Sequence, residues 1–167
     1  MTRIATLTTT LGLALLASGA QAQSLYGEVG YTGLDYSGPG LKVSPAMVRG
    51  VVGYEFTPQL ALEGMLGLGA RSDSSAGSTL KLDNTIGVFG KAQVPLNDAF
   101  KVYGRVGVAR TALKTNGVSD SSTGLAWGAG ASYDLSKTTY LNVDYTRYLD
   151  KDSQKLDGIT AGIGFRF

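Results

Sequence analysis

Apolar and polar residues alternate one by one along eight stretches of the chain that follow an apolar leader. Alternation with a period of two is typical of a β-strand whose two faces meet different surroundings. In the first stretch, for example, Leu25, Val29 and Tyr31 share one face and Glu28 lies on the other. The eight predicted strands cover residues 25–34, 46–56, 60–70, 80–94, 100–108, 125–135, 140–149 and 159–167.

The connections between these stretches are alternately short and long. Residues 57–59, 95–99 and 136–139 are short connections, whereas 37–45, 71–79, 110–123 and 150–158 are longer and rich in Ser, Gly, Asp and Asn. Strict alternation of this kind predicts consecutive hairpins with two distinct ends. We therefore expect one all-β domain, an eight-stranded antiparallel up-and-down barrel. Residues 115–123 are either a recognition surface or a solvated loop.

Charges of both signs gather on the polar face of the predicted strands. Met65 and Phe89 are the main large apolar residues of this face. Six cations and five anions nearly balance, as a paired network in a narrow interior requires, because burying an unpaired charge is costly. The charged residues of this face are Glu28, Arg49, Glu55, Glu63, Lys81, Asp83, Lys91, Lys101, Arg105, Asp144 and Arg166.

The alternation leaves open which face is inside. A soluble barrel or sandwich would bury the apolar face, whereas a transmembrane barrel turns it outward to lipid. Two observations favour the transmembrane barrel. The polar face is rich in Gly, which makes room inside a narrow barrel, and aromatic residues gather near the strand ends, as in the interfacial girdles of membrane barrels. The predicted girdle residues are Tyr31, Tyr54, Phe56, Phe100, Trp127 and Tyr133.

Composition excludes most chemistry that a chain of 167 residues could carry. The chain has no Cys and no His, so disulfides, Ser-His-Asp devices and His- or Cys-ligated metals are excluded. A net charge of +2 gives no electrostatic reason to bind nucleic acid. Glu63, Asp83 and Asp144 could act as acid and base, but a structural ion-pair network explains them better. We expect no catalytic residue, metal or cofactor.

Residues 1–22 have the features of a secretory signal peptide. Arg3 supplies a positive start, residues 11–17 form a short apolar core, and Ala20-Gln21-Ala22 is a small-residue cleavage site. The apolar run is shorter than the ~20 residues of a membrane-spanning helix. We therefore expect Sec-type export, cleavage after Ala22 and a barrel made from residues 23–167.

The end of the chain carries a family resemblance. Thr160, Gly162, Phe165 and Phe167 match the terminal pattern of bacterial outer-membrane barrels, in which a polar residue, a glycine and two aromatics recur at fixed spacing. With the eight strands and the leader, residues 25–167 resemble the small OmpA/OmpX-type barrels. The resemblance implies the outer membrane of a Gram-negative bacterium, contact with its lipids and lipopolysaccharide, and recognition of the terminal pattern by the barrel-assembly machinery.

Two functions remain open at this stage. The first is a structural or interaction role at the envelope surface, through lipopolysaccharide or other surface contacts, with a ligand that the sequence does not identify. The alternative is a narrow, porin-like channel for ions or small solutes, although an eight-stranded barrel is only wide enough for its own side chains. An enzyme is disfavoured, because the lipid A acyltransferase, lipid A deacylase and aspartyl-type protease families on such barrels all use a His, and this chain has none.

Overall fold

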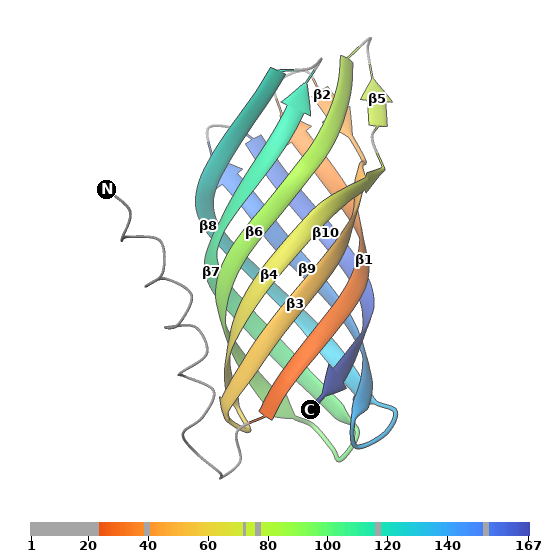
Figure 1. The fold of residues 1–167 in the computed structure, drawn as a ribbon, viewed down its shortest axis with the longest axis vertical. Helices are drawn as coiled ribbons and strands as arrows, with labels where there is room; N and C mark the ends of the chain where they lie inside the picture. The colour runs from red at the N-terminus through yellow and green to blue at the C-terminus, as the bar shows by residue number, and fades with distance from the viewer. Residues whose placement is uncertain (1–23, 39–40, 72, 76–77, 116–117, 152–153) are drawn as a thin grey trace, which may run out of the picture.

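The computed structural model describes residues 24–38, 41–71, 73–75, 78–115, 118–151 and 154–167 (Figure 1). The predicted signal peptide lies outside the described residues. Among the described residues, no helix is long and apolar enough to cross a membrane. The described chain is built from strands and their turns.

Eight long strands form one closed antiparallel barrel, which confirms the predicted fold class. Neighbouring strands are paired in chain order, and the last strand pairs with the first, from Tyr26–Arg166 to Ser37–Lys155. Two short strands add to the rim, where β2 pairs with β1 and β5 pairs with β6. The bounds are β1 Ser24–Gly38, β2 Leu41–Val43, β3 Ala46–Thr57, β4 Leu60–Arg71, β5 Asp73–Ser75, β6 Ser78–Pro95, β7 Phe100–Thr115, β8 Val118–Asp134, β9 Thr139–Lys151 and β10 Gln154–Arg166.

The stagger of the strands sets the width of the barrel. The ladder that starts at Tyr31 reaches Asn84 of β6 through β3 and β4, but it reaches Val94 of β6 through β10, β9, β8 and β7. The register is therefore displaced by ten residues around the ring. Eight tilted strands with such a stagger leave an interior about as wide as the side chains that fill it.

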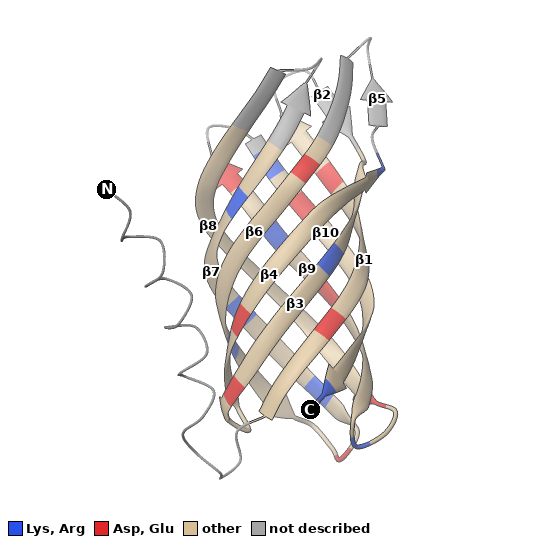
Figure 2. Cartoon of the chain, viewed as in Figure 1, with Lys and Arg blue, Asp and Glu red and all other residues tan. Residues whose placement is uncertain are grey.

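The apolar face points outward over most of every strand. Val52, Leu66, Val88 and Val106 are about half exposed, whereas Glu63 between its outward neighbours is fully buried. Figure 2 shows charged residues along the strands as well as at their ends. The barrel thus has an apolar exterior and a largely polar interior, the reverse of a soluble barrel.

The prediction that residues 110–123 form a long connection is wrong. Strand β7 continues to Thr115 and β8 begins at Val118, and the two strands are paired as far as Thr115–Val118. The strands also extend into the other long connections, so that β9 ends at Lys151 and β10 begins at Gln154. We attribute the error to alternation that fades where both faces of a strand meet water, so that the sequence there looks like a loop.

One β-bulge reverses the predicted faces at the start of β6. Leu113 pairs with Leu82 and Ala112 pairs with Asn84, so Asp83 is the extra residue between them. Beyond this bulge Leu82 points into the barrel and is fully buried, although strict alternation places it outside. Asp83, predicted to point inward, is instead half-buried at the bulge itself.

Candidate functional site

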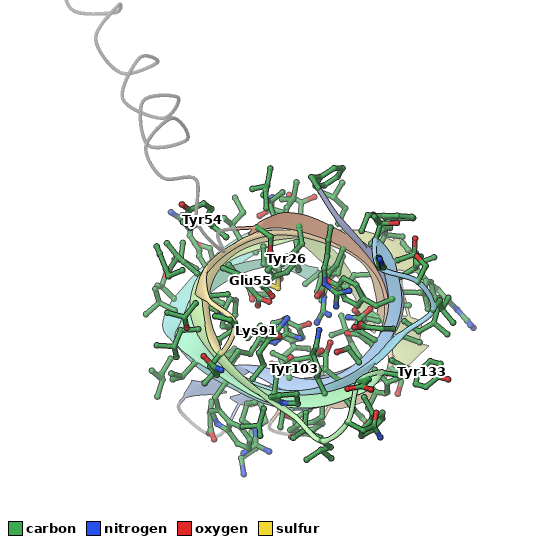
Figure 3. All side chains as sticks on the ribbon, turned by 90° about the horizontal axis from the view of Figure 1, so that it is seen from below. Tyr26, Tyr54, Glu55, Lys91, Tyr103 and Tyr133 are labelled. Carbon is green, nitrogen blue, oxygen red and sulfur yellow. The ribbon has the colours of Figure 1, made fainter. Side chains whose placement is uncertain are left out.

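Side chains from every wall of the barrel meet in its interior. Figure 3 shows Tyr26, Lys91 and Tyr103 pointing into the lumen, while Tyr54 and Tyr133 point away from it. The interior is layered along the barrel axis. A partly open polar ring lies at the short-turn end, an ionic cluster lies in the middle, and apolar side chains fill the end with the long strands.

The middle layer is a charge-balanced group that we call the central ionic cluster. Arg49 Nη1 donates to Asp144 Oδ1 at 2.9 Å, and Arg105 Nη2 lies 2.6 Å from the same oxygen. The two oxygens of Glu63 contact one cation each, with Oε1 3.1 Å from Lys91 Nζ and Oε2 3.3 Å from Arg105 Nη1. Every member is at most 5% exposed. The six members are Glu28, Arg49, Glu63, Lys91, Arg105 and Asp144.

Most of these ion pairs cross the lumen, whereas Glu63 and Lys91 lie on the neighbouring strands β4 and β6. Arg49 on β3 reaches Asp144 on β9, and the two strands are not neighbours in the ring. Arg105 on β7 likewise joins Glu63 on β4 to Asp144 on β9. Side chains that span the interior in this way fill its cross-section. They also tie opposite walls of the barrel together.

Three inward tyrosines, which the sequence analysis assigned to no role, complete the cluster. Tyr26 donates to Glu63 Oε1 at 2.7 Å, and Tyr140 donates to Glu28 Oε1 at 2.8 Å. Lys91 Nζ lies 4.8 Å from the ring centre of Tyr26 and 4.4 Å from that of Tyr103. The tyrosines therefore satisfy carboxylates and flank the ammonium group at once. Their parity could have revealed them, because Tyr26 shares a face with Glu28, and Tyr103 with Arg105.

The short-turn end is closed by a looser ring of polar contacts. Asp134 accepts from Lys101 Nζ at 3.2 Å and from Arg166 Nη2 at 2.7 Å. On the opposite wall Glu55 accepts from Gln93 Nε2 at 2.8 Å. The side chains of Lys101, Asp134 and Arg166 are partly exposed, as expected at a mouth of the barrel. Asp134 was missed in the sequence because it lies at the end of its strand.

The other end of the interior is apolar. Two threonine pairs lie between this apolar end and the central ionic cluster. The Oγ1 atoms of Thr32 and Thr160 are 2.9 Å apart, and the Thr85 hydroxyl donates to Thr111 Oγ1 at 3.2 Å. Above them a set of buried side chains, which we call the upper apolar cluster, fills the lumen between the long strands. Its members are Leu34, Tyr36, Met47, Leu82, Tyr148, Leu149 and Leu156.

The remaining predicted residues fall in three places. Asp83 stands at the β6 bulge, outside the central ionic cluster, and the Lys81 side chain lies outside the described residues. Gly162 is directly opposite Gly30, and Thr160 is one of the buried threonines. The exposed outward aromatics near the short turns are Phe56, Tyr133, Phe165 and Phe167, with Tyr54 and Phe100 half-buried beside them.

A second outward aromatic group lies nearer the long strands. Trp127 packs beside Tyr145 with ring centres 6.0 Å apart, and Arg147 lies over the Trp127 ring at 5.6 Å. Arg147 also makes two hydrogen bonds to Asp157, at 2.7 and 3.1 Å. Tyr31 is 54% exposed on β1. Bands of aromatics at two heights are what membrane barrels place at the two interfaces.

The cluster has the chemistry of a structural network. Each carboxylate of the central ionic cluster is already engaged by cations or hydroxyl groups, so none is left as an evident base or metal ligand. Among the described residues, no three His, Cys, Asp or Glu side chains gather closely enough to hold a metal ion.

Comparisons with known proteins agree with this geometry. Residues 7–167 match the outer membrane protein β-barrel domain family. No curated protein matches the chain. Many solved structures share the fold, and three of them, in the order that follows, have TM-scores of 0.69, 0.71 and 0.59. They are Ail, the attachment invasion locus protein of Yersinia pestis, in complex with the heparin analogue sucrose octasulfate (21% identity, 88% of this chain and 100% of that one), Neisserial surface protein A (18%, 88% and 100%) and the N-terminal barrel of Pseudomonas aeruginosa OprF (16%, 85% and 97%).

The family match covers all eight strands of the barrel. An apolar exterior, two outward aromatic bands and a closed ladder without free edges at mid-height are what a strand-built membrane protein needs. The chain therefore belongs to the outer membrane protein β-barrel domain family and lies in the outer membrane of a Gram-negative bacterium.

Proposed function

We propose that this barrel serves as a surface-interaction protein of the outer membrane. The observation that carries the proposal is the filled interior. Arg49, Arg105 and Asp144 bridge opposite walls, and the upper apolar cluster fills the lumen above them. Because the interior of the barrel is filled, only its exterior and its rim can bind other molecules. Short turns face the periplasm in such barrels, so the long strands are directed out of the cell.

The porin-like alternative is not favoured by the same geometry. An ion that crosses the lumen would have to separate fully buried ion pairs and then pass a layer of packed apolar side chains. Because the Ail structure holds a heparin analogue, sulfated polysaccharide is a useful first probe for this chain. Lipopolysaccharide is a second probe.

Binding by whole cells tests the proposal. The chain is displayed in a Gram-negative host, and attachment of the cells to immobilised heparin and to immobilised lipopolysaccharide is measured. In the matched control, an Asn-Gly turn replaces residues 113–120 and joins Ala112 to Ser121, which are directly paired. We expect attachment with the intact chain and its loss in the shortened one, with equal outer-membrane yields. Equal attachment of both strains, or attachment no greater than that of the empty host, would contradict the proposal.

Two predictions about biogenesis stay proposals. We infer that residues 1–22 are removed after export and that the assembly machinery reads Thr160, Gly162, Phe165 and Phe167. The outward exposure of Phe165 and Phe167 on the last strand supports the second inference. Mass spectrometry of the mature protein tests the first, because cleavage after Ala22 makes Gln23 the N-terminal residue.

A further inference from the structure

A pocket lies on the outward face of the barrel, at the upper edge of the second aromatic group, where β9, β10 and β1 are neighbours. Its volume of about 650 Å³ is in the range of small-ligand sites. Asp35 is four residues above Tyr31 on β1, which is about 10 Å higher at ~3.4 Å per residue and a strand tilt of ~40°. The lining residues are Gly33, Leu34, Asp35, Ser37, Tyr145, Asp157, Gly158 and Ile159.

A glycine forms the floor of the pocket. On β1, Gly33, Asp35 and Ser37 alternate with inward residues such as the buried Leu34, so the three share the outward face. A Cβ at Gly33 would meet no atom within 4 Å, and the residue lies in a regular strand. The pocket is therefore open because no side chain stands at this position. Ile159, directly opposite on β10, gives the pocket an apolar wall.

A second wall is polar and is held in place by Arg147. Arg147 donates to the two oxygens of Asp157 at 2.7 and 3.1 Å, and its Nη2 also donates to the Tyr145 hydroxyl at 3.2 Å. The guanidinium group in turn lies over the Trp127 ring. The oxygens of Asp157 and Tyr145 are thus positioned before a ligand arrives, which lowers the entropic cost of binding.

The polar groups that face this wall are free. Asp35 is exposed and directly opposite Asp157, and Ser37 lies two residues further up β1. Among the described residues, no hydrogen bond or ion pair engages the side chain of Asp35 or Ser37. Like charges directly opposite each other destabilise a sheet, so the position of Asp35 is not explained by folding. Local conflicts of this kind are expected at functional sites.

The charges around the pocket balance. Asp35 and Asp157 face two cations, Arg147 and, at the upper rim opposite Ser37, Lys155. The pocket therefore gives no net attraction to a charged ligand. Its carboxylates accept hydrogen bonds, and its hydroxyl and ammonium groups donate them. A ring that carries several hydroxyl groups and has apolar C–H faces satisfies both kinds of group and packs against the apolar wall. Sugars have this chemistry.

We propose that this pocket binds an uncharged sugar ring, whose hydroxyl groups donate to Asp35 and Asp157 in charge-assisted hydrogen bonds. The inference goes beyond the proposed function, because the pocket is separate from the strand tips that the attachment experiment shortens. The ring belongs either to lipopolysaccharide of the same membrane or to a glycan outside the cell, and both sources present the same chemistry.

Saturation-transfer NMR tests the proposal. The full-length barrel in phospholipid nanodiscs is titrated with the methyl glycosides of glucose, galactose, mannose and N-acetylglucosamine, each alone, and we expect saturable binding of at least one. Gly33→Leu fills the floor and should abolish binding. Gly50→Leu makes the same change at another outward glycine with an open Cβ position and should bind like the unmodified barrel.

A change of one carboxylate is the second test. Asp35→Asn should weaken binding of the glycoside about tenfold, because a neutral acceptor makes a weaker hydrogen bond than a carboxylate. Asp98→Asn removes an exposed carboxylate at the short-turn end and is the matched control. Gel migration before and after heating confirms that each variant is folded.

Nanodiscs that contain lipopolysaccharide distinguish the two sources. If lipopolysaccharide of the same membrane fills the pocket, the glycoside binds in phospholipid nanodiscs and is excluded from the barrel in these. If the ring belongs to a glycan outside the cell, the glycoside binds equally in both. Either result supports a sugar pocket.

Three results would overturn the sugar pocket. They are no binding of any of the four glycosides in phospholipid nanodiscs, equal binding by Gly33→Leu and Gly50→Leu, and tighter binding of spermidine or glucose 6-sulfate than of every glycoside, which would assign the pocket to a charged ligand. If whole cells attach to heparin or lipopolysaccharide while no glycoside binds, the sugar pocket is wrong and the surface-interaction function stands.

Discussion

Each inward tyrosine of the central layer lies over a glycine of the next strand. Tyr26 is directly opposite Gly53, and a Cβ at that glycine would overlap the tyrosine ring. Tyr140 stands in the same relation to Gly164, on β10. We predicted that inward glycines make room inside the narrow barrel. At these positions the room is used by tyrosine rings, which hold the carboxylates.

A methyl group at Gly53 tests this packing. We expect Gly53→Ala to lower the free energy of unfolding by about 1–3 kcal/mol, because the added carbon overlaps a buried ring. Gly50→Ala is the matched control on the same strand, since its Cβ would point outward, with Leu66 O as its nearest neighbour at 3.9 Å. Urea unfolding in lipid vesicles measures both. Equal stability of the two variants would show that the Tyr26 ring moves aside at no cost.

The shared carboxylate of Glu63 gives a prediction about charge. Glu63→Gln leaves Lys91 and Arg105 short of an anion, and Lys91→Met leaves Glu63 with one cation fewer. Each single change should cost about 3 kcal/mol, because it strands a buried charge. The double variant should recover part of the loss, and a double-mutant cycle of unfolding free energies measures the coupling. Zero coupling would mean that water, not the partner, solvates each charge.

At the scale of single strands, the outward face of each strand contacts the lipid of the membrane. Val106 is 56% exposed on β7, amid other outward aliphatic side chains. Val106→Arg should lower stability by roughly 2–4 kcal/mol, the cost of a cation near the middle of the bilayer. Ala70→Arg, near the upper end of β4, should have little effect because it lies beside Arg71, outside the apolar band. Normal folding of Val106→Arg in lipid vesicles would argue against the assignment of faces.

The last strand carries a prediction about assembly. Phe165→Ser with Phe167→Ser should sharply reduce the amount of folded barrel in the outer membrane, because the terminal aromatics are the proposed recognition signal. Phe100→Ser with Tyr133→Ser removes two other aromatics of the same band and is the matched control. Gel migration before and after heating, on outer-membrane fractions, distinguishes folded from unfolded chain. Equal yields of the two double variants would contradict a special role of the C-terminal residues.

Sequence alternation predicted the strands correctly where their two faces meet different surroundings. Between the aromatic bands, lipid lies on one side and a polar lumen on the other, so residues such as Glu63 and Val106 could be assigned to a face. Near the rim this contrast is lost, and residues 110–123 looked like a loop, although residues 110–115 are paired with 118–123. The bulge at Asp83 defeated the parity rule, because nothing in the sequence signals the extra residue. In β9 the sequence did signal an irregularity, since a charged residue, Arg147, takes the outward parity and Tyr148 the inward one, and the structure has a bulge with Tyr148 as the extra residue.

The chemistry of the interior was partly visible in the sequence. Charge and parity were enough to group Glu63, Lys91 and Arg105, which the structure brings into contact. They could not give the cross-lumen partners, because which opposite walls meet depends on the stagger of the whole ring. The inward tyrosines were overlooked because the predicted girdles already accounted for aromatic residues.

At the scale of the whole molecule, the barrel combines a neutral, packed interior with an apolar exterior and a tall rim. Three cations balance three anions in the central ionic cluster, so the membrane-spanning layer holds no net charge from these groups. Cross-lumen pairs make the walls interdependent, because any opening of the lumen breaks several pairs at once.

Single-channel conductance in planar bilayers tests the filled interior most directly. Purified barrel at neutral pH should give no stable unitary current steps, and Thr123→Val, with its change far from the ionic cluster, should be equally silent. Lys91→Met should also remain closed, because Tyr103, Arg105 and the upper apolar cluster still fill the lumen. Stable unitary steps from the unmodified barrel, with an amplitude that shifts in the Lys91 variant, would contradict the account and establish a channel.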